Sequence, residues 1–171
     1  MKIFTIFILT SSILFAGIFD FKTISSDFKQ TITNEENTKI IYEGSLYATT
    51  DAKALWEYKK PVNKKIYFNQ NRVVILEPEL EQAIVTDLQS TPNLTELLKS
   101  AKKIDEKTYE TSYDDITYTI HAKSGQIDYI SYMDKLENRV TIQMLNLTTN
   151  TVLDDSLFRV TIPSNYDIIT Q

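Results

Sequence analysis

The sequence has no cysteine among its 171 residues, and it has only three glycines and one histidine. The absence of cysteine excludes disulfides, a thiol nucleophile and an acylated cysteine that could anchor the exported chain. A hydrophobic core must therefore supply the stability. With so few glycines, a sheet formed by this chain has few places to bend sharply, and we expect a wide, smoothly curved sheet.

Few residues are suited to catalysis. His121 stands alone in TYTIHAK, and the zinc, serine hydrolase and redox motifs HExxH, GxSxG and CxxC are absent, as is a glycine-rich phosphate loop. We expect a structural or surface role for His121. A carboxylate pair for glycoside hydrolysis could come from Glu77, Glu79, Glu81 and Asp87, but acids that flank a turn are more often solvated loop groups. We expect no enzyme, no cofactor and no metal site.

The N-terminus is typical of a secretory signal peptide. Lys2 precedes an apolar run from Ile3 to Phe15, and small residues follow at Ala16 and Gly17. The run is shorter than the roughly 20 residues of a comfortable transmembrane helix. We expect a signal peptide over residues 1–16 and a single domain over residues 17–171, with export to a periplasm. A retained anchor helix and a buried N-terminal helix are the alternatives.

Acidic residues outnumber basic ones. Removal of residues 1–16 takes away Lys2 and no acid, so 18 basic residues become 17 against 23 acidic ones, and the net charge changes from −5 to −6. Such a charge disfavours nucleic acid and anionic lipid headgroups as the main partner, but not an apolar ligand.

The apolar pattern predicts a mainly β protein. Spacings of three and four among Ile18, Phe21, Ile24 and Phe28 predict a short amphipathic helix over residues 18–33. A second helix is predicted over residues 90–103, with Ser90 or Thr91 as cap and Pro92 in the first turn. Short segments rich in β-branched and aromatic residues predict strands at residues 40–48, 54–58, 65–68, 72–76, 83–88, 108–113, 116–122, 126–133, 139–147, 158–162 and 166–170. FNQNRV and HAKSGQI predict hairpin turns.

Ten or eleven such strands indicate a large antiparallel sheet, curled into a barrel or half-barrel. In ALWEYKK, residues Ala54, Trp56 and Tyr58 share one face. Leu46 and Ala48 lie together in the preceding strand, and Ile127 is expected opposite Ile130. Such aromatic faces usually fill a core. The alternative is a concave sheet, lined with aromatic residues and roofed by the two helices.

The chain also resembles a known family. The likeness is carried by Phe28-Lys29-Gln30, Glu43-Gly44-Ser45-Leu46-Tyr47, Leu55-Trp56-Glu57-Tyr58, Lys60-Pro61, Glu77-Pro78, Leu80-Glu81-Gln82-Ala83 and the closing Phe158 with Ile162-Pro163. These motifs resemble the LolA family of periplasmic outer-membrane lipoprotein carriers, strongly over residues 28–85 and more weakly to the end of the chain.

The resemblance implies an incomplete (half-open) antiparallel β-barrel with an α-helical lid over an apolar cavity. It also implies a carrier that takes acylated lipoproteins from an inner-membrane ABC-type releasing complex and delivers them to the outer membrane. An outer-membrane acceptor lipoprotein is a further implied partner, and we expect a monomer. The alternatives are a periplasmic binding protein for another lipid or glycolipid, and a domain that senses lipoproteins without ferrying them.

The resemblance also assigns cavity residues. It places the expected acyl-chain contacts at Ile24 and Phe28 on the first helix, Leu46, Ala48 and Trp56 on strands, and Leu94, Leu97 and Leu98 on the second lid helix. Ala54 and Tyr58 are added because they share a strand face with Trp56. Two positions depart from better-known members of the family. Thr50 stands where they carry an Arg that ties the lid to the barrel, and Ala54 stands where they carry a bulky aromatic. A neutral Thr cannot make the charge-assisted bonds of a guanidinium, so lid closure must rest on other contacts.

Overall fold

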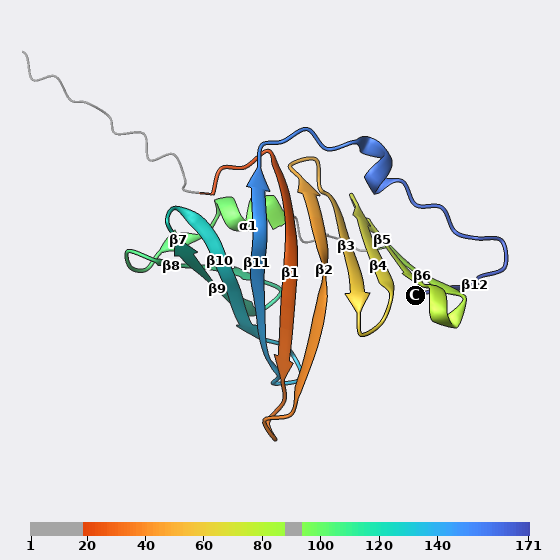
Figure 1. Cartoon of the computed structure of the whole chain (residues 1–171), viewed down its shortest axis with the longest axis horizontal. Coiled ribbons are helices and arrows are strands. Elements are labelled where there is room, and N and C mark those ends of the chain that lie inside the picture. Colours follow the sequence, from red (N-terminus) through yellow and green to blue (C-terminus); the bar gives the residue numbers. More distant parts are fainter. Residues whose placement is uncertain (1–18, 88–93) are drawn as a thin grey trace, which may run out of the picture.

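A computed structural model describes residues 19–87 and 94–171. The described chain forms one open, curved sheet of twelve strands in the order β12-β6-β5-β4-β3-β2-β1-β11-β10-β9-β8-β7 (Figure 1). The predicted large antiparallel sheet is confirmed, with twelve strands in place of ten or eleven. The expected signal peptide and the predicted helix cap at Ser90 to Pro92 lie outside the described residues.

The strands are β1 (Thr23–Thr33), β2 (Lys39–Thr49), β3 (Lys53–Lys60), β4 (Lys64–Asn69), β5 (Arg72–Glu77), β6 (Gln82–Asp87), β7 (Lys102–Lys103), β8 (Thr108–Tyr113), β9 (Ile116–Lys123), β10 (Gln126–Met133), β11 (Arg139–Thr149) and β12 (Asp167–Thr170). One α-helix, α1 (Leu94–Lys99), and two short 3₁₀ helices, η1 (Pro78–Leu80) and η2 (Asp155–Phe158), complete the described elements. Every neighbouring pair of strands is antiparallel except β12, which runs parallel to β6.

The predicted first helix is wrong, because residues 23–33 form β1 at the centre of the sheet. Ile24 and Phe28 are four residues apart, a spacing that fits one face of a strand as well as one face of a helix. Ser26 and Gln30 complete the alternation and are both buried. The hydroxyl of Ser26 donates to the Leu145 carbonyl at 2.9 Å, and Gln30 accepts a hydrogen bond from Tyr58. Satisfied hydrogen bonds allow these polar residues to occupy inward positions.

Both predicted hairpin turns are present. Gln70 has a φ of 53° between β4 and β5. Ser124 and Gly125 have φ values of 52° and 78° between β9 and β10, the pair of positive values that a type I′ turn requires. The second helix prediction is also confirmed, with α1 shorter than the predicted segment.

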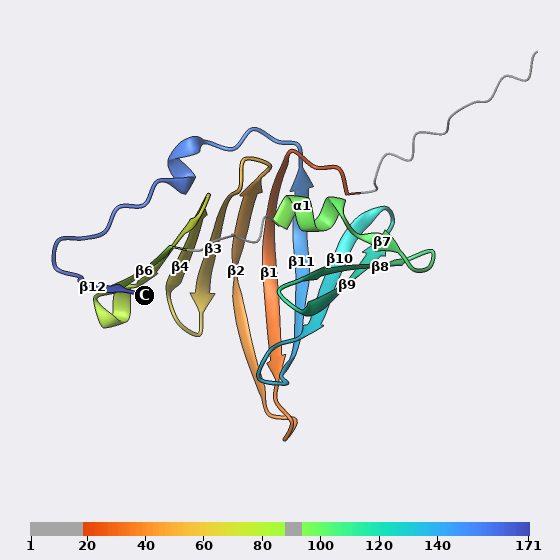
Figure 2. The same cartoon turned by 180° about the vertical axis from the view of Figure 1, so that it is seen from behind.

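The sheet buries apolar residues on both faces. The larger cluster, on the concave face that carries α1, includes Phe19, Phe28, Leu46, Ile120 and Val140. Figure 2 shows α1 lying across this face, over the central strands. A second cluster lies on the opposite, outer face and holds Leu55, Tyr67, Val74, Leu76, Ala83 and Phe158. The alternation of β3 therefore divides its side chains between two cores.

The segment after β11 crosses the outer face before it returns to the far edge of the sheet as β12 (Figure 1). The strand predicted at residues 158–162 is wrong: Phe158 ends η2, and residues 159–163 have no regular structure. Phe158 is buried and Ile162 packs against the outer cluster. Their apolar side chains pack against the outer face of the sheet, and their backbone does not pair as a strand.

A register shift in β10 corrects a further expectation. Ile127 and Ile130, which strict alternation places on opposite faces, both belong to the concave cluster. The irregularity between Ile127 and Tyr129 in the pairing with β9 accounts for this, because an extra residue in a β-bulge reverses the alternation beyond it. Among the described residues, no helix has the length and apolar character needed to cross a membrane.

Candidate functional site

An apolar cavity of about 240 Å³ lies between the concave face of the sheet and α1. Both halves of the curved sheet contribute to its wall, together with the helix above. The lining residues are Gln30, Ala54, Trp56, Tyr58, Ile66, Phe68, Leu94, Leu97, Leu98, Thr111, Tyr118, Ile120, Ile130, Tyr132 and Ile142. Aromatic and aliphatic side chains predominate, so the cavity is suited to an apolar ligand.

One wall is built from alternate residues of β3 and their partners on β4. Ala54 is paired with Phe68, Trp56 with Ile66, and Tyr58 with Lys64. Because paired residues of antiparallel strands point to the same face, all three pairs face the concave side. The first two pairs are apolar and the third is polar, so the wall changes in character along its length.

Phe28 supports this wall from β1. Its ring centroid lies 5.1 Å from that of Trp56 and 5.1 Å from that of Tyr58, edge-on in both cases. This packing is permitted by Gly44 on β2, where a Cβ would lie 2.8 Å from Cζ of Phe28 and closer still to the carbonyl oxygen of Glu57. The glycine therefore lets the aromatic ring sit against the backbone, and the ring in turn fixes Trp56 and Tyr58.

Tyrosine hydroxyls gather at one end of the cavity. Tyr58 donates a hydrogen bond from its hydroxyl to Oε1 of Gln30 at 3.0 Å, and its ring meets that of Tyr42 edge-on at 5.7 Å. Burial, with Tyr132 and Tyr42 nearby, raises the pKa of Tyr58 above its usual value. Burial, with Tyr118 at a centroid distance of 4.8 Å, raises the pKa of Tyr132 to about 12. These phenols are therefore neutral near pH 7 and can donate hydrogen bonds.

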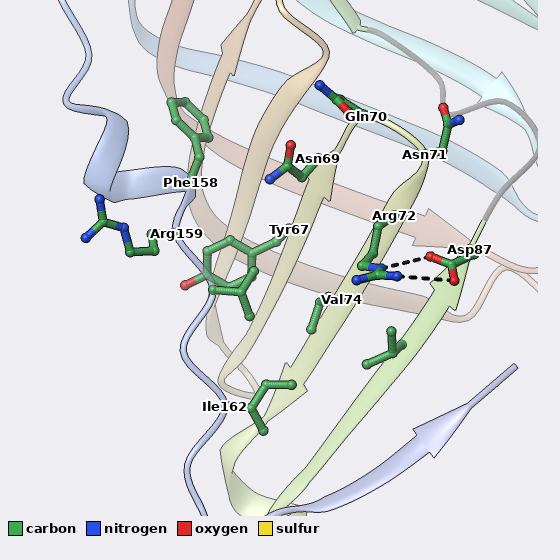
Figure 3. A pocket seen from close by; sticks show the side chains of 12 residues that line it. Tyr67, Asn69, Gln70, Asn71, Arg72, Val74, Asp87, Phe158, Arg159 and Ile162 are labelled. Atoms are coloured by element: carbon green, nitrogen blue, oxygen red, sulfur yellow. Dashed lines mark hydrogen bonds and ion pairs between the residues drawn. The ribbon is translucent and has the colours of Figure 1, made fainter.

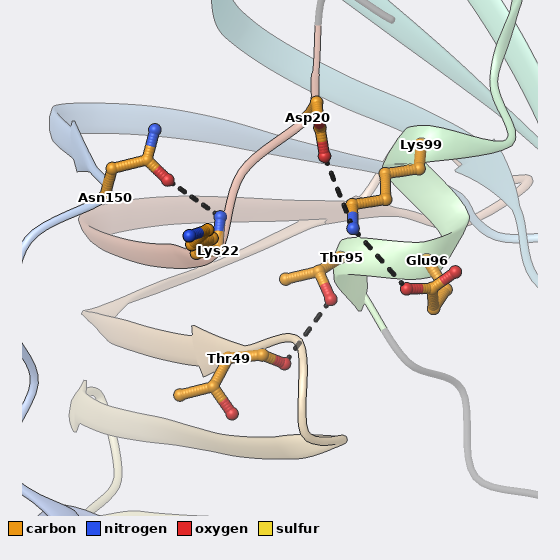
Figure 4. A network of polar contacts seen from close by, with 7 residues as sticks. All are labelled: Asp20, Lys22, Thr49, Thr95, Glu96, Lys99 and Asn150. Carbon is orange, nitrogen blue, oxygen red and sulfur yellow. Dashed lines mark hydrogen bonds and ion pairs between the residues drawn. The ribbon is translucent and has the colours of Figure 1, made fainter.

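The roof of the cavity is α1, which presents Leu94, Leu97 and Leu98 to it. Thr95 on the same helix is fully buried, and its hydroxyl donates to the backbone carbonyl of Thr49 at 3.4 Å (Figure 4). This bond joins the helix to the end of β2, the strand that lies beside β3.

An ion pair adds a second tie. Nζ of Lys99 lies 3.3 Å from Oδ1 of Asp20, just before β1, and 3.7 Å from Oε1 of Glu96 on its own helix (Figure 4). Thr50, which replaces the Arg implied by the resemblance, donates from its backbone N–H to the carbonyl of Lys22 at 3.0 Å. In this chain, the side chains of Thr95 and Lys99 join the helix to the elements around it.

The ten predicted contact residues fall into two groups. Ala54, Trp56, Tyr58, Leu94, Leu97 and Leu98 line the cavity. Ile24, Phe28, Leu46 and Ala48 are at most 1% exposed and belong to the core of the same face, beside or beneath the lining. Ile24 and Phe28 come from β1, because the helix predicted for them does not form. Contact of any of these residues with acyl chains stays a prediction.

Sequence reasoning missed the opposite wall, which comes from β8 to β11. Its lining residues are Thr111, Tyr118, Ile120, Ile130, Tyr132 and Ile142. Ile120 pairs with Ile130, and Ile130 with Ile142, so the three isoleucines form one cross-strand row. Alternation within each segment gave a signal for these faces, but a single sequence does not reveal which strands pair across the sheet.

A second hollow, of about 770 Å³, lies on the outer face between the sheet and the C-terminal segment (Figure 3). Its lining includes Tyr67 and Val74 from the sheet, and Phe158 and Arg159 from the C-terminal segment. Arg72 and Asp87 also line it, and Nε of Arg72 lies 2.8 Å from Oδ1 of Asp87. This groove has an ion pair and several amides at its border, so the concave cavity is the better candidate for a long apolar ligand.

Reactive groups do not gather in either hollow. His121 stacks on Tyr129 with ring centroids 4.1 Å apart, which agrees with the expected structural role. No group of three or more potential metal ligands occurs among residues 19–87 and 94–171. The acids Glu77 and Asp87 have structural partners instead, since Glu77 accepts a hydrogen bond from Gln82 and Asp87 pairs with Arg72.

Residues 20–115 match the family model described as outer membrane lipoprotein carrier protein LolA. Two curated relatives carry the description outer-membrane lipoprotein carrier protein. The protein from Campylobacter jejuni is 40% identical over 168 residues, which are 98% of each chain. The protein from Wolinella succinogenes is 34% identical over 172 residues and covers 100% of each chain.

Solved structures share the fold at much lower identity. A LolA superfamily protein from Nitrosomonas europaea has a TM-score of 0.51 and 11% identity, with 81% of this chain and 90% of that one covered. An uncharacterized conserved protein from Thermus thermophilus has a TM-score of 0.53 and 8% identity, with 88% and 91% covered. At these identities the similarity is one of fold, the curved sheet, and not of sequence.

Proposed function

Because this chain belongs to the outer membrane lipoprotein carrier protein LolA family, we propose that it is a periplasmic chaperone for lipoproteins. It takes up lipoproteins released from the inner membrane, shields their acyl chains in the concave cavity and delivers them to the outer membrane. The observation that carries this proposal is the apolar cavity under α1, lined by aromatic and aliphatic side chains from both halves of the sheet.

The cavity supplies what the transport of acyl chains requires. Exposure of a buried methylene to water costs about 0.8 kcal/mol, so an acyl chain does not cross an aqueous compartment unshielded. A wall of Trp56, Ile66 and Leu97 holds such a chain without directional bonds, and cargo can leave again when a competing apolar site is offered. The same reasoning explains why this site needs no nucleophile or acid–base pair.

Loading requires the cavity to widen. Its volume of about 240 Å³ is below the roughly 300–1,000 Å³ of typical ligand pockets. The element best suited to move is α1, because it has only six residues and is not paired into the sheet. A hydrogen bond of Thr95 and an ion pair of Lys99 join it to its surroundings, and both can break and re-form. We therefore place cargo entry at the roof, with the sheet as the fixed wall.

The partners follow from this role. We propose an inner-membrane ABC-type lipoprotein-releasing complex as donor and an outer-membrane lipoprotein as acceptor, with energy supplied by the donor. The signal peptide expected over residues 1–16 would place the carrier in the periplasm, where we expect it to act as a monomer.

The decisive test is release of labelled lipoprotein from spheroplasts. We expect the purified protein to form a soluble complex with the lipoprotein, and we expect Trp56→Glu or Leu97→Glu to abolish that complex while the protein stays folded. A charge buried in the cavity would both fill it and oppose an apolar ligand. Leu136→Glu is the control, because Leu136 is 80% exposed and absent from the cavity lining.

If the wild-type protein releases no lipoprotein, the carrier proposal fails. Native mass spectrometry of protein purified from a periplasm then identifies any other lipid or glycolipid cargo. If Leu97→Glu and Trp56→Glu still carry lipoprotein, the site assignment is wrong even though the activity stands.

A further inference from the structure

The concave face is graded from apolar to polar along the strands. Five strands make the same two-residue step: Phe28 then Gln30 in β1, Trp56 then Tyr58 in β3, Ile66 then Lys64 in β4, Ile120 then Tyr118 in β9, and Ile130 then Tyr132 in β10. Strands β1, β3 and β10 run in one direction, and β4 and β9 run in the other. All five steps therefore point to the same end of the cavity. We call Gln30, Tyr58, Lys64, Tyr118 and Tyr132 the polar end.

The other end is apolar. There Ala54 and Phe68 face each other across β3 and β4, and the leucines of α1 close the cavity. From Ala54 to Tyr58 the wall extends over four residues, or about 13 Å at a rise of roughly 3.3 Å per residue. A single alkyl chain can lie along this wall with its head at the polar end.

Lys64 distinguishes the polar end from an ordinary tyrosine cluster. Its Nζ lies 5.0 Å from the ring centroid of Tyr58, a cation–π contact beside the cavity lining. Within the described part of the chain, no carboxylate forms an ion pair with this ammonium group. Neighbouring lysines differ in this respect, because Lys65 pairs with Glu57 at 2.9 Å and Lys60 pairs with Glu43 at 3.4 Å.

We propose that the polar end binds the anionic head group, a carboxylate or a phosphate, of an acyl ligand whose chain lies toward α1. Lys64 supplies the opposite charge, and the hydroxyl of Tyr132 and the amide of Gln30 donate hydrogen bonds. This inference rests on the proposed function, because it requires acyl chains to enter the cavity. It adds a preference among such ligands that an apolar cavity alone would not give.

Trp56 makes the test direct, because it is the only tryptophan of the chain and it lines the cavity. A brominated fatty acid and the brominated fatty alcohol of equal chain length quench tryptophan fluorescence when they bind beside it. Titrations at pH 8 and low salt compare the wild type with Lys64→Gln and Lys65→Gln. Lys65 is the matched control, since it is adjacent and points to the outer face with Glu57.

We expect the wild type and Lys65→Gln to bind the acid about fivefold more tightly than the alcohol, the effect of one partly exposed charge pair. In Lys64→Gln the acid and the alcohol should bind equally, with affinity for the alcohol unchanged. A third titration, with a brominated lysophosphatidic acid, distinguishes the two head groups. If this ligand binds more tightly than the fatty acid, the site prefers a phosphate; if it binds more weakly, the site prefers a carboxylate.

Equal binding of acid and alcohol by the wild type, or an unchanged preference in Lys64→Gln, would overturn the head-group site and leave the acyl-chain cavity standing. If neither acid nor alcohol quenches Trp56, the cavity proposal fails and this inference fails with it. Circular dichroism of each variant confirms that the sheet is intact.

Discussion

Gly44 is the residue at which the wall of the cavity depends most directly on the absence of a side chain. A methyl group there would collide with the backbone carbonyl of Glu57 and the ring of Phe28, and a carbonyl in a sheet cannot move aside cheaply. We expect Gly44→Ala to lower the free energy of unfolding by about 1–3 kcal/mol, measured by urea denaturation. Gly125→Ala is the comparison, because it meets no neighbouring atom and adds only the strain of a positive φ, about 1 kcal/mol. Wild-type stability of Gly44→Ala would contradict this account.

The buried tyrosines make stability depend on alkaline pH. In the folded protein the pKa of Tyr132 is raised by burial to about 12 and that of Tyr58 is raised also, whereas an unfolded tyrosine titrates near 10. The folded state therefore disfavours the phenolate. The contribution of these groups to stability is complete below pH 10 and is lost as the pH rises toward 12 and beyond.

Urea denaturation between pH 8 and 11 should show the free energy of unfolding falling above pH 10, and Tyr132→Phe should make that fall shallower. The exposed carboxylates that pair on the surface do not titrate in this interval. If Tyr132→Phe has the same pH dependence as the wild type, burial does not set the pKa of this residue.

At the scale of elements, we expect substitutions of two threonines to have opposite effects on the docking of α1. The hydroxyl of Thr95 donates to the Thr49 carbonyl, and Thr95 is fully buried. The hydroxyl of Thr49 is itself buried, with no hydrogen-bond partner in the described part of the structure. Thr95→Val should loosen the helix, whereas Thr49→Val removes an unsatisfied group and should be neutral or stabilising.

Hydrogen exchange of the α1 amides measures this difference. We expect Thr95→Val to speed exchange by about five- to tenfold, for a bond worth about 1 kcal/mol or slightly more, and Thr49→Val to leave it unchanged or slower. Equal protection in the two variants would show that the leucine contacts alone hold the helix.

The elements also show what the sequence alone could predict. Segments rich in β-branched and aromatic residues, such as ALWEYKK and RVVIL, formed strands at the expected residues, and the turns at Gln70 and Ser124-Gly125 followed from their residue types. β1 was misassigned because Ser26 and Gln30 are buried polar residues, which hide a period of two. The segment at residues 158–162 has strand-like composition, but tertiary contact with the outer face decides its structure.

For the candidate site, local alternation gave the shared face of Ala54, Trp56 and Tyr58 on β3, and the family resemblance gave Leu94, Leu97 and Leu98 as lid residues. The opposite wall depends on the long-range pairing of β8 to β11 and on the bulge in β10, neither of which has a local signal. The polar end could not be recognised either, because the common direction of its five steps appears only when the strand order is known.

At the scale of the whole molecule, the two faces of the sheet separate stability from binding. Phe158 fills the outer core, on the side of the sheet away from the cavity. We expect Phe158→Ala to cost about 3–5 kcal/mol of stability, measured by urea denaturation, because a buried ring is replaced by a void. Where the variant remains folded, its affinity for a brominated fatty alcohol should equal that of the wild type. A large loss of affinity in folded Phe158→Ala would mean that the two faces are coupled.

The pairing of β1 with β11 sets the order in which the molecule can assemble. Ile24 is the partner of Thr149, so the two strands at the centre of the sheet come from segments more than a hundred residues apart. Such non-local contacts make folding slow, in the range of roughly milliseconds to seconds, because the entropy of closing a long loop is lost before the contacts can stabilise the chain. During synthesis, the aromatic strands β3 and β4 emerge long before β11 can complete the sheet. The nascent carrier therefore passes through a period in which its own apolar segments are open to aggregation, and holding chaperones would be needed at that stage.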